Sequence, residues 1–472
     1  MDNLYIFSIG GSGAKCLESL VHLCAVGLGP KEVHPVLIDP DQENGNLDRT
    51  SSLILLYEKI REKLKNPEEG SFFYTDIKKL IYWNPLSKKV QKKEDENYSD
   101  KSKNLEDVIG YTTINQEEKL LSELLLKKDQ RKLNLKFGFR GVPSIGSVVL
   151  HQIKKQDFYK ETLHNLKSNE SNKGFVFASI FGGTGASGYP VITQLLKLQD
   201  IKNKIGGVIL MPYFYLKSPH NIDETIKPDS STFILNTIGA IPFYIRDIKS
   251  DTNYVIGDME TEPIPKYSLG GREQLNDSHF IELIAALASL SFSKHGDNLN
   301  RYSALKVSTP ITDGSKDFSI SLNDLPIDKN GKHLLRKFGL FVNSFRVIFK
   351  SVNENELDEV LFLLGWLNSK LKISKNQMNE TKKDLKDIYA YLEKFIIWNR
   401  QMSQNTPSLK LFHEEFEFQH ILLSAESTLE GKLEDELDRY YLKYCDTQKT
   451  SISQKILSTM NAGINKYLLN NK

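Results

Sequence analysis

The sequence has little cysteine, which excludes several kinds of protein. Its three cysteines, Cys16, Cys24 and Cys445, lie in no spacing typical of a metal site and are too few for a disulfide framework. Such sparse use of cysteine is typical of a reducing compartment. We therefore expect a cytoplasmic protein.

The chain also lacks long apolar runs and an excess of charge of one sign. No stretch reaches the ~20 apolar residues that a membrane span needs, and the start, MDNLYIFSIGGSGAKC, does not resemble a signal peptide. The formal net charge of +2 gives no electrostatic reason to expect nucleic acid or an anionic membrane as a partner. With 472 residues, 39% of them hydrophobic and 26% charged, the chain is typical of a globular protein with two or three domains.

Short apolar runs alternate with helical patterns through the first half of the chain. This alternation is typical of an α/β protein with a mostly parallel sheet. We expect six strands in that sheet, at residues 4–9, 33–39, 136–139, 174–180, 205–214 and 253–257.

Two predicted helices and one insertion complete this picture. Residues 117–133 have the spacing of an amphipathic helix, and residues 277–294 are apolar nearly all round, as in a helix buried between two layers. Residues 86–107 have few apolar and many charged side chains, so we interpret them as a solvated surface insertion.

Two glycine-rich stretches follow predicted strands and lead into helical patterns. The first is Gly10, Gly11, Ser12 and Gly13, and the second is Gly182, Gly183, Thr184, Gly185, Ala186, Ser187 and Gly188. Backbone without side chains can approach a ligand closely, and a helix N-terminus attracts anions such as phosphate. The first stretch matches neither GxGxxG nor GxxxxGK[ST] and alone would also fit a tight turn without a ligand. Two such stretches at parallel strand ends can hold one polyphosphate from two sides.

Two acids end the second predicted strand, in the sequence VLIDPDQENGN. Asp39 and Asp41 can accept hydrogen bonds from ribose hydroxyls at this position, or can hold Mg²⁺ through water. A turn or helix cap made by Asp and Asn explains the same residues equally well.

The second glycine stretch, as GGTGASGYPV, resembles the GGGTGxG signature loop of the tubulin/FtsZ superfamily. Phe181 stands in place of the first glycine of that signature. Gly10 to Gly13 match the first glycine loop of the family. The sequence GFRGVPSIGS, residues 138–147, resembles the FtsZ segment with G-A-N-P-E-V-G, so that Gly141, Pro143 and Gly146 match the loop that senses the terminal phosphate. Plain turn chemistry is the alternative for this segment.

The resemblance implies GTP or GDP as the ligand, with Mg²⁺ as a further candidate. Residues 211–221 take the place of the sugar-contacting loop. The strand ending in DTNYVIGD puts Asp258 where the family has an asparagine that meets the base. A carboxylate can accept from N1–H and N2–H of guanine, so guanine selectivity is still permitted.

For hydrolysis, the family uses a loop with the pattern N-x-D-x-x-[D/E], which reaches the nucleotide from the next subunit. The candidate here is SLNDLPID, residues 321–328, in which Asn323 and Asp328 keep the five-residue offset while Leu325 replaces the middle aspartate. We therefore expect Asn323 and Asp328 to be the catalytic residues. A proline-containing loop with acids that face water is the alternative.

The resemblance implies four parts of the chain. The GTP-binding domain comprises residues 1–270, with its charged insertion at about 86–107. The central connecting helix comprises residues 271–296, and a smaller α+β domain with the catalytic loop comprises residues 297–351. A helical C-terminal region comprises residues 352–472. We interpret His279 and Glu282 in the central helix as structural, because such residues near a domain junction usually hydrogen-bond across it.

These patterns leave three functions open. The first is a GTP-binding protein that assembles head to tail with copies of itself into filaments and hydrolyses GTP at the subunit interface, with no nucleic-acid or membrane partner. The second is a regulatory or scaffold protein that does not polymerise and binds a protein partner through residues 352–472, for instance in a bacterial defence or stress system. The third is a dinucleotide-dependent oxidoreductase, which the second glycine stretch disfavours.

Overall fold

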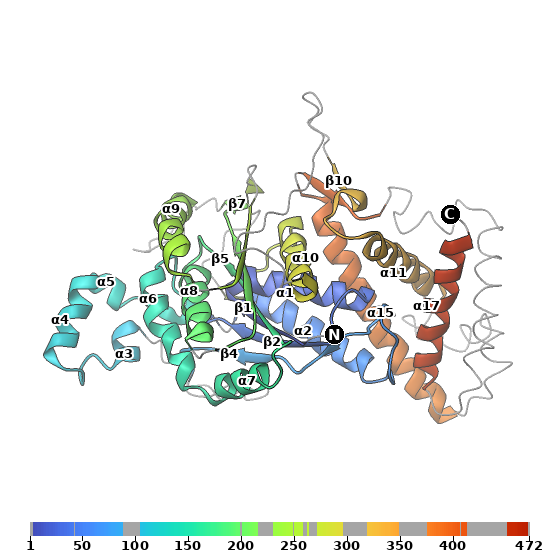
Figure 1. Ribbon diagram of the computed structural model, residues 1–472, viewed down its shortest axis with the longest axis horizontal. Coiled ribbons are helices and arrows are strands. Elements are labelled where there is room, and N and C mark those ends of the chain that lie inside the picture. The colour runs from blue at the N-terminus through green and yellow to red at the C-terminus, as the bar shows by residue number, and fades with distance from the viewer. Residues whose placement is uncertain are drawn as a thin grey trace, which may run out of the picture. The chain divides into compact units, whose positions relative to one another are not determined.

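The computed structural model describes residues 3–41, 43–87, 104–198, 201–215, 230–248, 250–257, 262–263, 271–295, 319–348, 375–405, 407–412 and 451–470 (Figure 1). The chain forms two compact units. The first contains Met1–Leu20, Glu32–Ser52 and Ile77–Lys306, and the second contains Val21–Lys31, Leu53–Asp76 and Val307–Lys472. None of the described helices is long and apolar enough to cross a membrane.

The first unit is built on a mostly parallel sheet, as the alternating pattern predicted. Its strand order is β3-β2-β1-β5-β6-β8, and β4 pairs with β2. The bounds are β1 Leu4–Ile9, β2 Glu32–Ile38, β3 Asp76–Ile77, β4 Ile81–Trp83, β5 Lys173–Ser179, β6 Ile205–Leu210 and β8 Thr252–Ile256. The predicted α/β class is therefore confirmed.

One predicted strand of this sheet is wrong, and the strand predicted at 205–214 ends at Leu210. Residues 136–139 contribute to a short 3-10 helix, Leu135–Phe137, followed by a turn. Asn134 starts this helix by accepting a hydrogen bond from the N–H of Lys136, and Gly138 then takes a φ of 82°. A strand cannot continue through such a positive φ. Strands β3 and β4 were not predicted, because two and three residues are too few for a periodic signal.

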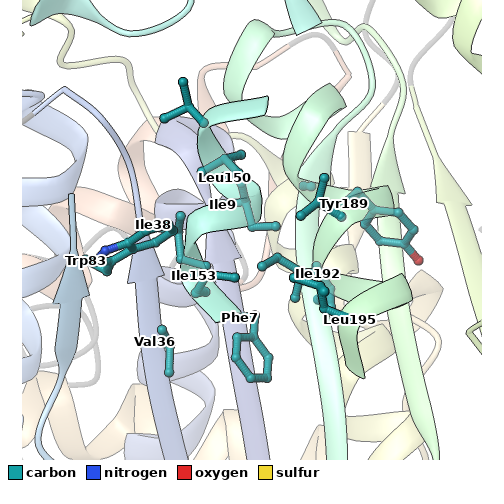
Figure 2. Close-up of a cluster of buried hydrophobic side chains, with 14 of the residues drawn as sticks. Phe7, Ile9, Val36, Ile38, Trp83, Leu150, Ile153, Tyr189, Ile192 and Leu195 are labelled. Atoms are coloured by element: carbon teal, nitrogen blue, oxygen red, sulfur yellow. The ribbon is translucent and has the colours of Figure 1, made fainter. Parts of the chain in front are cut away.

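Alternate residues of the strands face two helical layers. On one face, Phe7 and Ile9 of β1 pack in a cluster with Ile192 of α8, Gly183–Lys197, and with Leu150 of α6, Pro143–Leu150 (Figure 2). On the other face, Phe175 of β5 lies 5.4 Å between ring centroids from Phe292 of α10, Phe280–His295.

Two adjacent glycines in β6 let both helices approach the sheet. A Cβ at Gly206 would lie 2.8 Å from Phe292 Cε2 of α10, and a Cβ at Gly207 would lie 2.6 Å from Tyr189 Cε2 of α8. Such close approach of a helix to a strand needs glycine. Residues 280–292 of α10 are almost all buried, which confirms the prediction of a helix between layers.

The remaining elements of the first unit connect these layers. The predicted helix over 117–133 is divided, because Leu126 is extended with φ −135° and ψ 131°. The elements are α1 Gly10–Val26, α2 Gly45–Arg61, α3 Leu105–Ile109, α4 Gln116–Leu125, α5 Lys128–Arg131, a 3-10 helix His151–Lys155, α7 Asp157–Lys167, β7 Phe214–Tyr215, α9 Ser230–Asp247, β9 Glu262–Pro263 and a 3-10 helix Gly271–Glu273. The C-terminal parts of α1 and α2 belong to the second unit.

The second unit is mainly helical around an aromatic core. Phe72 stacks on Phe341 at 4.5 Å, and His22 lies 4.7 Å from Trp398, both between ring centroids. Its elements are β10 Ser319–Ser321, a 3-10 helix Leu322–Asp324, α11 Lys329–Ile348, α15 Lys375–Ser403, β11 Ser408–Lys410 and α17 Ile452–Asn470.

The sequence predictions for this part have mixed outcomes. The stretch ETKKDLKDIYAYLEKFIIW, residues 380–398, has the pattern of an amphipathic helix, and α15 confirms that helix. The stretch FRVIFKSV, residues 345–352, has a strand-like pattern, but this prediction is wrong over 345–348, which end α11. Two further patterns lie outside the described residues: a strand-like one in YSALKVST, residues 302–309, and an amphipathic helical one in ENELDEVLFLLGWLNSKLKI, residues 354–373.

Candidate functional site

The candidate site lies at the carboxyl ends of β2, β1 and β5. These strands are parallel neighbours, so the segments that follow them meet at one edge of the sheet. Asp39 follows β2 directly, Gly10 follows β1 directly, and Gly182 follows β5 after two residues. The structure thus brings the two predicted glycine stretches and the predicted acids together.

The first glycine stretch is the N-terminal turn of helix α1. Gly10 has a φ of +73°, which favours glycine, and a Cβ there would lie 3.4 Å from Thr184 Cβ of the second stretch. A Cβ at Gly11 would lie 3.2 Å from Asn44 Nδ2 and 3.4 Å from Asn46 Nδ2. The strand passes into the helix with no loop between them.

The glycines of both stretches fall into two groups. Three are buried because a helix packs closely on a strand: a Cβ would lie 2.9 Å from Phe177 O at Gly13, 2.5 Å from Ser179 O at Gly185 and 2.6 Å from Ile9 Cγ2 at Gly188. Gly10, Gly183, Ala186 and Ser187 are buried too. The half-buried members are Gly11, Ser12, Gly182 and Thr184. An anion can therefore meet only this smaller set.

The helix ends give these positions a preference for negative charge. Helices α1 and α8 both begin at this edge of the sheet, and the first N–H groups of a helix have no partner within it. Gly182, the N-cap of α8, has no side chain that could accept from the N–H groups of that helix. Unsatisfied N–H groups and the helix dipole together favour a phosphate or carboxylate.

The third predicted segment lies against the second glycine stretch. Arg140 and Gly141 have positive φ angles of 42° and 75°, and Pro143 begins α6. A Cβ at Gly183 would lie 2.8 Å from the backbone N of Gly141. Asn236 of α9 donates from Nδ2 to the carbonyl oxygens of Gly141 and Phe181, at 3.0 and 3.5 Å. Sequence reasoning missed Asn236, because a lone asparagine within a helical pattern gives no signal.

Asp39 and Asp41 are buried and shape the turn after β2. Asp39 Oδ1 accepts from the N–H of Asp41 at 2.9 Å, and Asp41 accepts from the N–H groups of Glu43 and Gly271 at 3.1 and 2.7 Å. Burial raises the pKa of both carboxyl groups, and repulsion by Asp41 raises the pKa of Asp39 further. A cation or a donor hydroxyl beside the pair would relieve this repulsion.

Two asparagines that follow these acids join the turn to the segment before α10. Asn44 Nδ2 donates to Gln274 Oε1 at 3.0 Å, and Asn46 Oδ1 accepts from the N–H of Asn276 at 3.0 Å. Asn44 also caps α2 by accepting from the N–H of Asn46 at 3.0 Å. The turn and cap roles expected as an alternative for this segment are therefore present.

A buried ion pair lies beneath the first glycine stretch. Lys15 Nζ is 2.5 Å from Glu282 Oε1, and that carboxylate also accepts from Tyr213 Oη at 2.6 Å and from the N–H of His279 at 2.9 Å. A hydrogen bond from Ser12 reaches Tyr213. His279 and Glu282 therefore have the structural role that the sequence indicated, while Lys15 was missed.

The predicted catalytic residues belong to the second unit. Asp328 Oδ1 accepts from the N–H of Gly331 at 2.6 Å and so caps the start of α11. Asn323 accepts from Lys332 Nζ through its carbonyl at 2.6 Å and from Arg336 Nη2 through its side chain at 3.1 Å. Asp258 lies outside the described residues, as do residues 216–221 of the predicted sugar-contacting loop.

Comparison with known proteins gives distant structural likenesses alone. The sequence matches no family model and no curated protein. Among solved structures, the chain is similar to CetZ from Methanosaeta thermophila strain DSM 6194, with 13% identity and a TM-score of 0.32, over 63% of this chain and 56% of that one. It is also similar to CetZ2 from Haloferax volcanii, described as a GTPgS-bound protofilament, with 13% identity and a TM-score of 0.31, over 62% and 59% of the two chains.

Both of these are tubulin/FtsZ-like structures, the superfamily that the glycine motifs resemble. This chain spans less than two thirds of the length of either one. Likenesses with such low TM-scores assign no function.

Proposed function

We propose that the chain is a tubulin/FtsZ-like protein that binds GTP at the carboxyl edge of β2, β1 and β5. The observation that carries this proposal is the contact of the two glycine stretches, where a Cβ at Gly10 would lie 3.4 Å from Thr184 Cβ. A dinucleotide fold uses one glycine turn at this edge. Two helix N-termini beside each other suit a polyphosphate, which carries several negative charges.

The half-buried residues of the two glycine stretches and the two buried acids fit the parts of a nucleoside triphosphate. Backbone N–H groups at Gly11 and Gly182 and the hydroxyls of Ser12 and Thr184 would hold phosphate oxygens, and Asp39 and Asp41 would accept from the ribose or face Mg²⁺ through water. Bound Mg²⁺ would neutralise charge on the phosphates. The described residues hold no group of three or more His, Cys, Asp or Glu side chains that could bind a metal ion, so phosphate and water would supply most of its ligands.

In this proposal, copies of the chain assemble head to tail and hydrolyse GTP where two copies meet. A heterologous contact that does not close into a ring produces an open filament. Asn323 and Asp328 of one copy would orient the attacking water beside the nucleotide of the next. Hydrolysis would then depend on assembly.

One observation favours a second function, a nucleotide-dependent switch without turnover. Asp328 is engaged as the cap of α11, and Asn323 is engaged with Lys332 and Arg336. These hydrogen bonds would have to break before either side chain could position a water molecule, which favours a protein without turnover. A switch protein would bind GTP and pass its state to a protein partner, for which residues 352–472 are the candidate region.

Sedimentation and phosphate release over a protein concentration series distinguish the two functions. The series is run with GTP, a non-hydrolysable GTP analogue, ATP and no nucleotide. GTP-dependent pelleting, with specific activity that rises steeply with protein concentration, would support the filament. Tight GTP binding without pelleting or concentration-dependent turnover would support the switch, and absence of any GTP binding would refute both.

A further inference from the structure

Helix α4, Gln116–Leu125, presents an apolar face to solvent. The structure describes this helix throughout, and none of its residues is buried. The exposed fractions are 55% for Leu120, 55% for Leu121, 82% for Leu124 and 67% for Leu125. Residues three and four apart are neighbours on a helix surface. Leu120 and Leu124, Leu121 and Leu125, and Leu121 and Leu124 have these spacings, so the four leucines form one continuous surface, which we call the α4 face.

An exposed apolar surface of this kind indicates a binding site for another molecule. Single exposed leucines are ordinary, but contiguous apolar patches on a protein surface mark interaction sites. The preceding stretch KVQKKEDENYSDKSK, residues 89–103, is almost entirely polar and so offers few apolar side chains to cover leucines.

The charges at the two ends of the α4 face differ in sign. Glu117 and Glu118 lie in the first turn of α4, whereas Lys127 and Lys128 follow its last turn, and all four are exposed. The helix dipole has the opposite arrangement, positive at the start and negative at the end. In an antiparallel pair, the acidic end of one α4 lies beside the basic end of the other, and the two dipoles also run in opposite directions. The charges of the α4 face are therefore complementary to those of a second α4 that runs in the opposite direction.

We propose that the α4 face binds the α4 face of a second copy of this chain around a two-fold axis. In an antiparallel pair centred between residues 122 and 123, Leu121 of one copy lies opposite Leu124 of the other, and the acidic first turn with Glu117 lies at the end where Lys128 of the other copy follows the helix. Each contact occurs twice, as in any isologous interface. A parallel pair would place like charges together, which costs free energy.

The leucines supply most of the affinity, and the charges set the orientation. Exposed ion pairs contribute little to affinity. A helix of ten residues is about 15 Å long, so the contact is small and the dimer transient, with a Kd on the order of micromolar or weaker. The contact needs no nucleotide. In head-to-tail filaments, its repetition would join two filaments side by side, with affinity raised by multivalency.

The test is sedimentation equilibrium of the full chain without nucleotide, from about 1 to about 200 μM, which spans the expected Kd. We expect a monomer–dimer equilibrium that Leu124→Glu abolishes, because it would bury a carboxylate among leucines. The control Leu55→Glu changes another leucine, 48% exposed on α2, and should leave the equilibrium unchanged. A chain that stays monomeric throughout, or a dimer that Leu124→Glu does not weaken, would overturn the proposal.

Charge reversal tests the antiparallel arrangement and the identity of the partner. Glu117→Lys alone and Lys128→Glu alone should each raise Kd by several-fold to about tenfold, since each turns two attractive pairs into repulsive ones. The double variant Glu117→Lys/Lys128→Glu restores both pairs and should return Kd to within about threefold of the wild type. A double variant weaker than either single variant would overturn the arrangement. Because no nucleotide is present, failure here leaves the proposed GTP site untouched.

Discussion

Lys15 Nζ lies 2.5 Å from Glu282 Oε1, and both side chains are almost fully buried, one at the start of α1 and the other in α10. The pair joins α1, which bears the first glycine stretch, to α10, which packs on β5, β6 and β8. Buried ion pairs are costly to form, and removal of one partner leaves a charge without compensation.

Glu282→Gln should therefore destabilise the protein strongly. We expect a loss of ~3–5 kcal/mol in the free energy of unfolding, because the Lys15 ammonium would remain buried without a counterion. The double variant Lys15→Met/Glu282→Gln removes that charge and should recover at least half of the loss. Urea unfolding measures all three free energies. A single variant as stable as the wild type, or a double variant no better than the single one, would contradict the prediction.

The buried His279 should lower the free energy of unfolding in mild acid. Burial, and secondly the charge of Lys15, lower its pKa from 6.5 to about 3. Below pH 6.5 the unfolded chain takes up a proton at this residue, while the folded chain stays neutral until about pH 3. The free energy of unfolding should therefore fall by up to ~1.4 kcal/mol per pH unit in this interval from this residue alone.

His279→Asn tests this origin of acid sensitivity. His279 precedes α10 and accepts from the N–H of Ile281 through Nδ1 at 3.2 Å, and asparagine can accept in the same way. Urea midpoints at about pH 7.5 and about pH 5 should differ less in this variant than in the wild type. His164→Asn, at an exposed position of α7, is the control. Equal pH dependence in all three proteins would refute the assignment.

The sequence predicts the layers of this fold better than the turns between them. The apolar patterns of strands such as β1 and β5, and of helix α10, indicate elements that are buried on both sides. The turn after Asn134 does not, because KFGF alternates like a strand while the positive φ of Gly138 depends on local packing. Sequence also cannot separate glycines that face a ligand from those, such as Gly185 and Gly188, that admit a neighbouring strand.

Asp39→Asn should stabilise the protein without ligand and weaken its response to ligand. Burial and the Asp41 carboxylate raise the pKa of Asp39, so the folded protein favours the protonated side chain more than the unfolded chain does. The stability that this residue contributes is therefore fully present below pH 3.8 and is lost as the pH rises through the folded-state pKa. Asparagine keeps the acceptor for the N–H of Asp41 but carries no charge. The variant should gain ~1–3 kcal/mol at about pH 7, an advantage that vanishes in acid.

Thermal unfolding with and without Mg²⁺ and GTP supplies the second half of that comparison. The wild type should gain more from the ligand than Asp39→Asn, because the carboxylate can accept from ribose or face the cation. A variant less stable than the wild type near neutral pH would show that the turn needs the charged form. Equal stabilisation of both proteins by ligand would remove Asp39 from the proposed site.

Thr184→Asp should abolish nucleotide binding while the fold is kept. Thr184 is half-buried in the first turn of α8, where an acidic side chain interacts favourably with the helix dipole. The same carboxylate would repel a polyphosphate at this helix end, and we expect at least a ~100-fold loss of GTP affinity. Thr184→Ser retains the hydroxyl and should bind within about threefold of the wild type. Calorimetric titration with GTP measures the affinities, and the midpoint of urea unfolding checks the fold. Unchanged affinity in a folded Thr184→Asp protein would place the phosphates away from α8 and would remove the contact between the two glycine stretches as the basis of the proposed function.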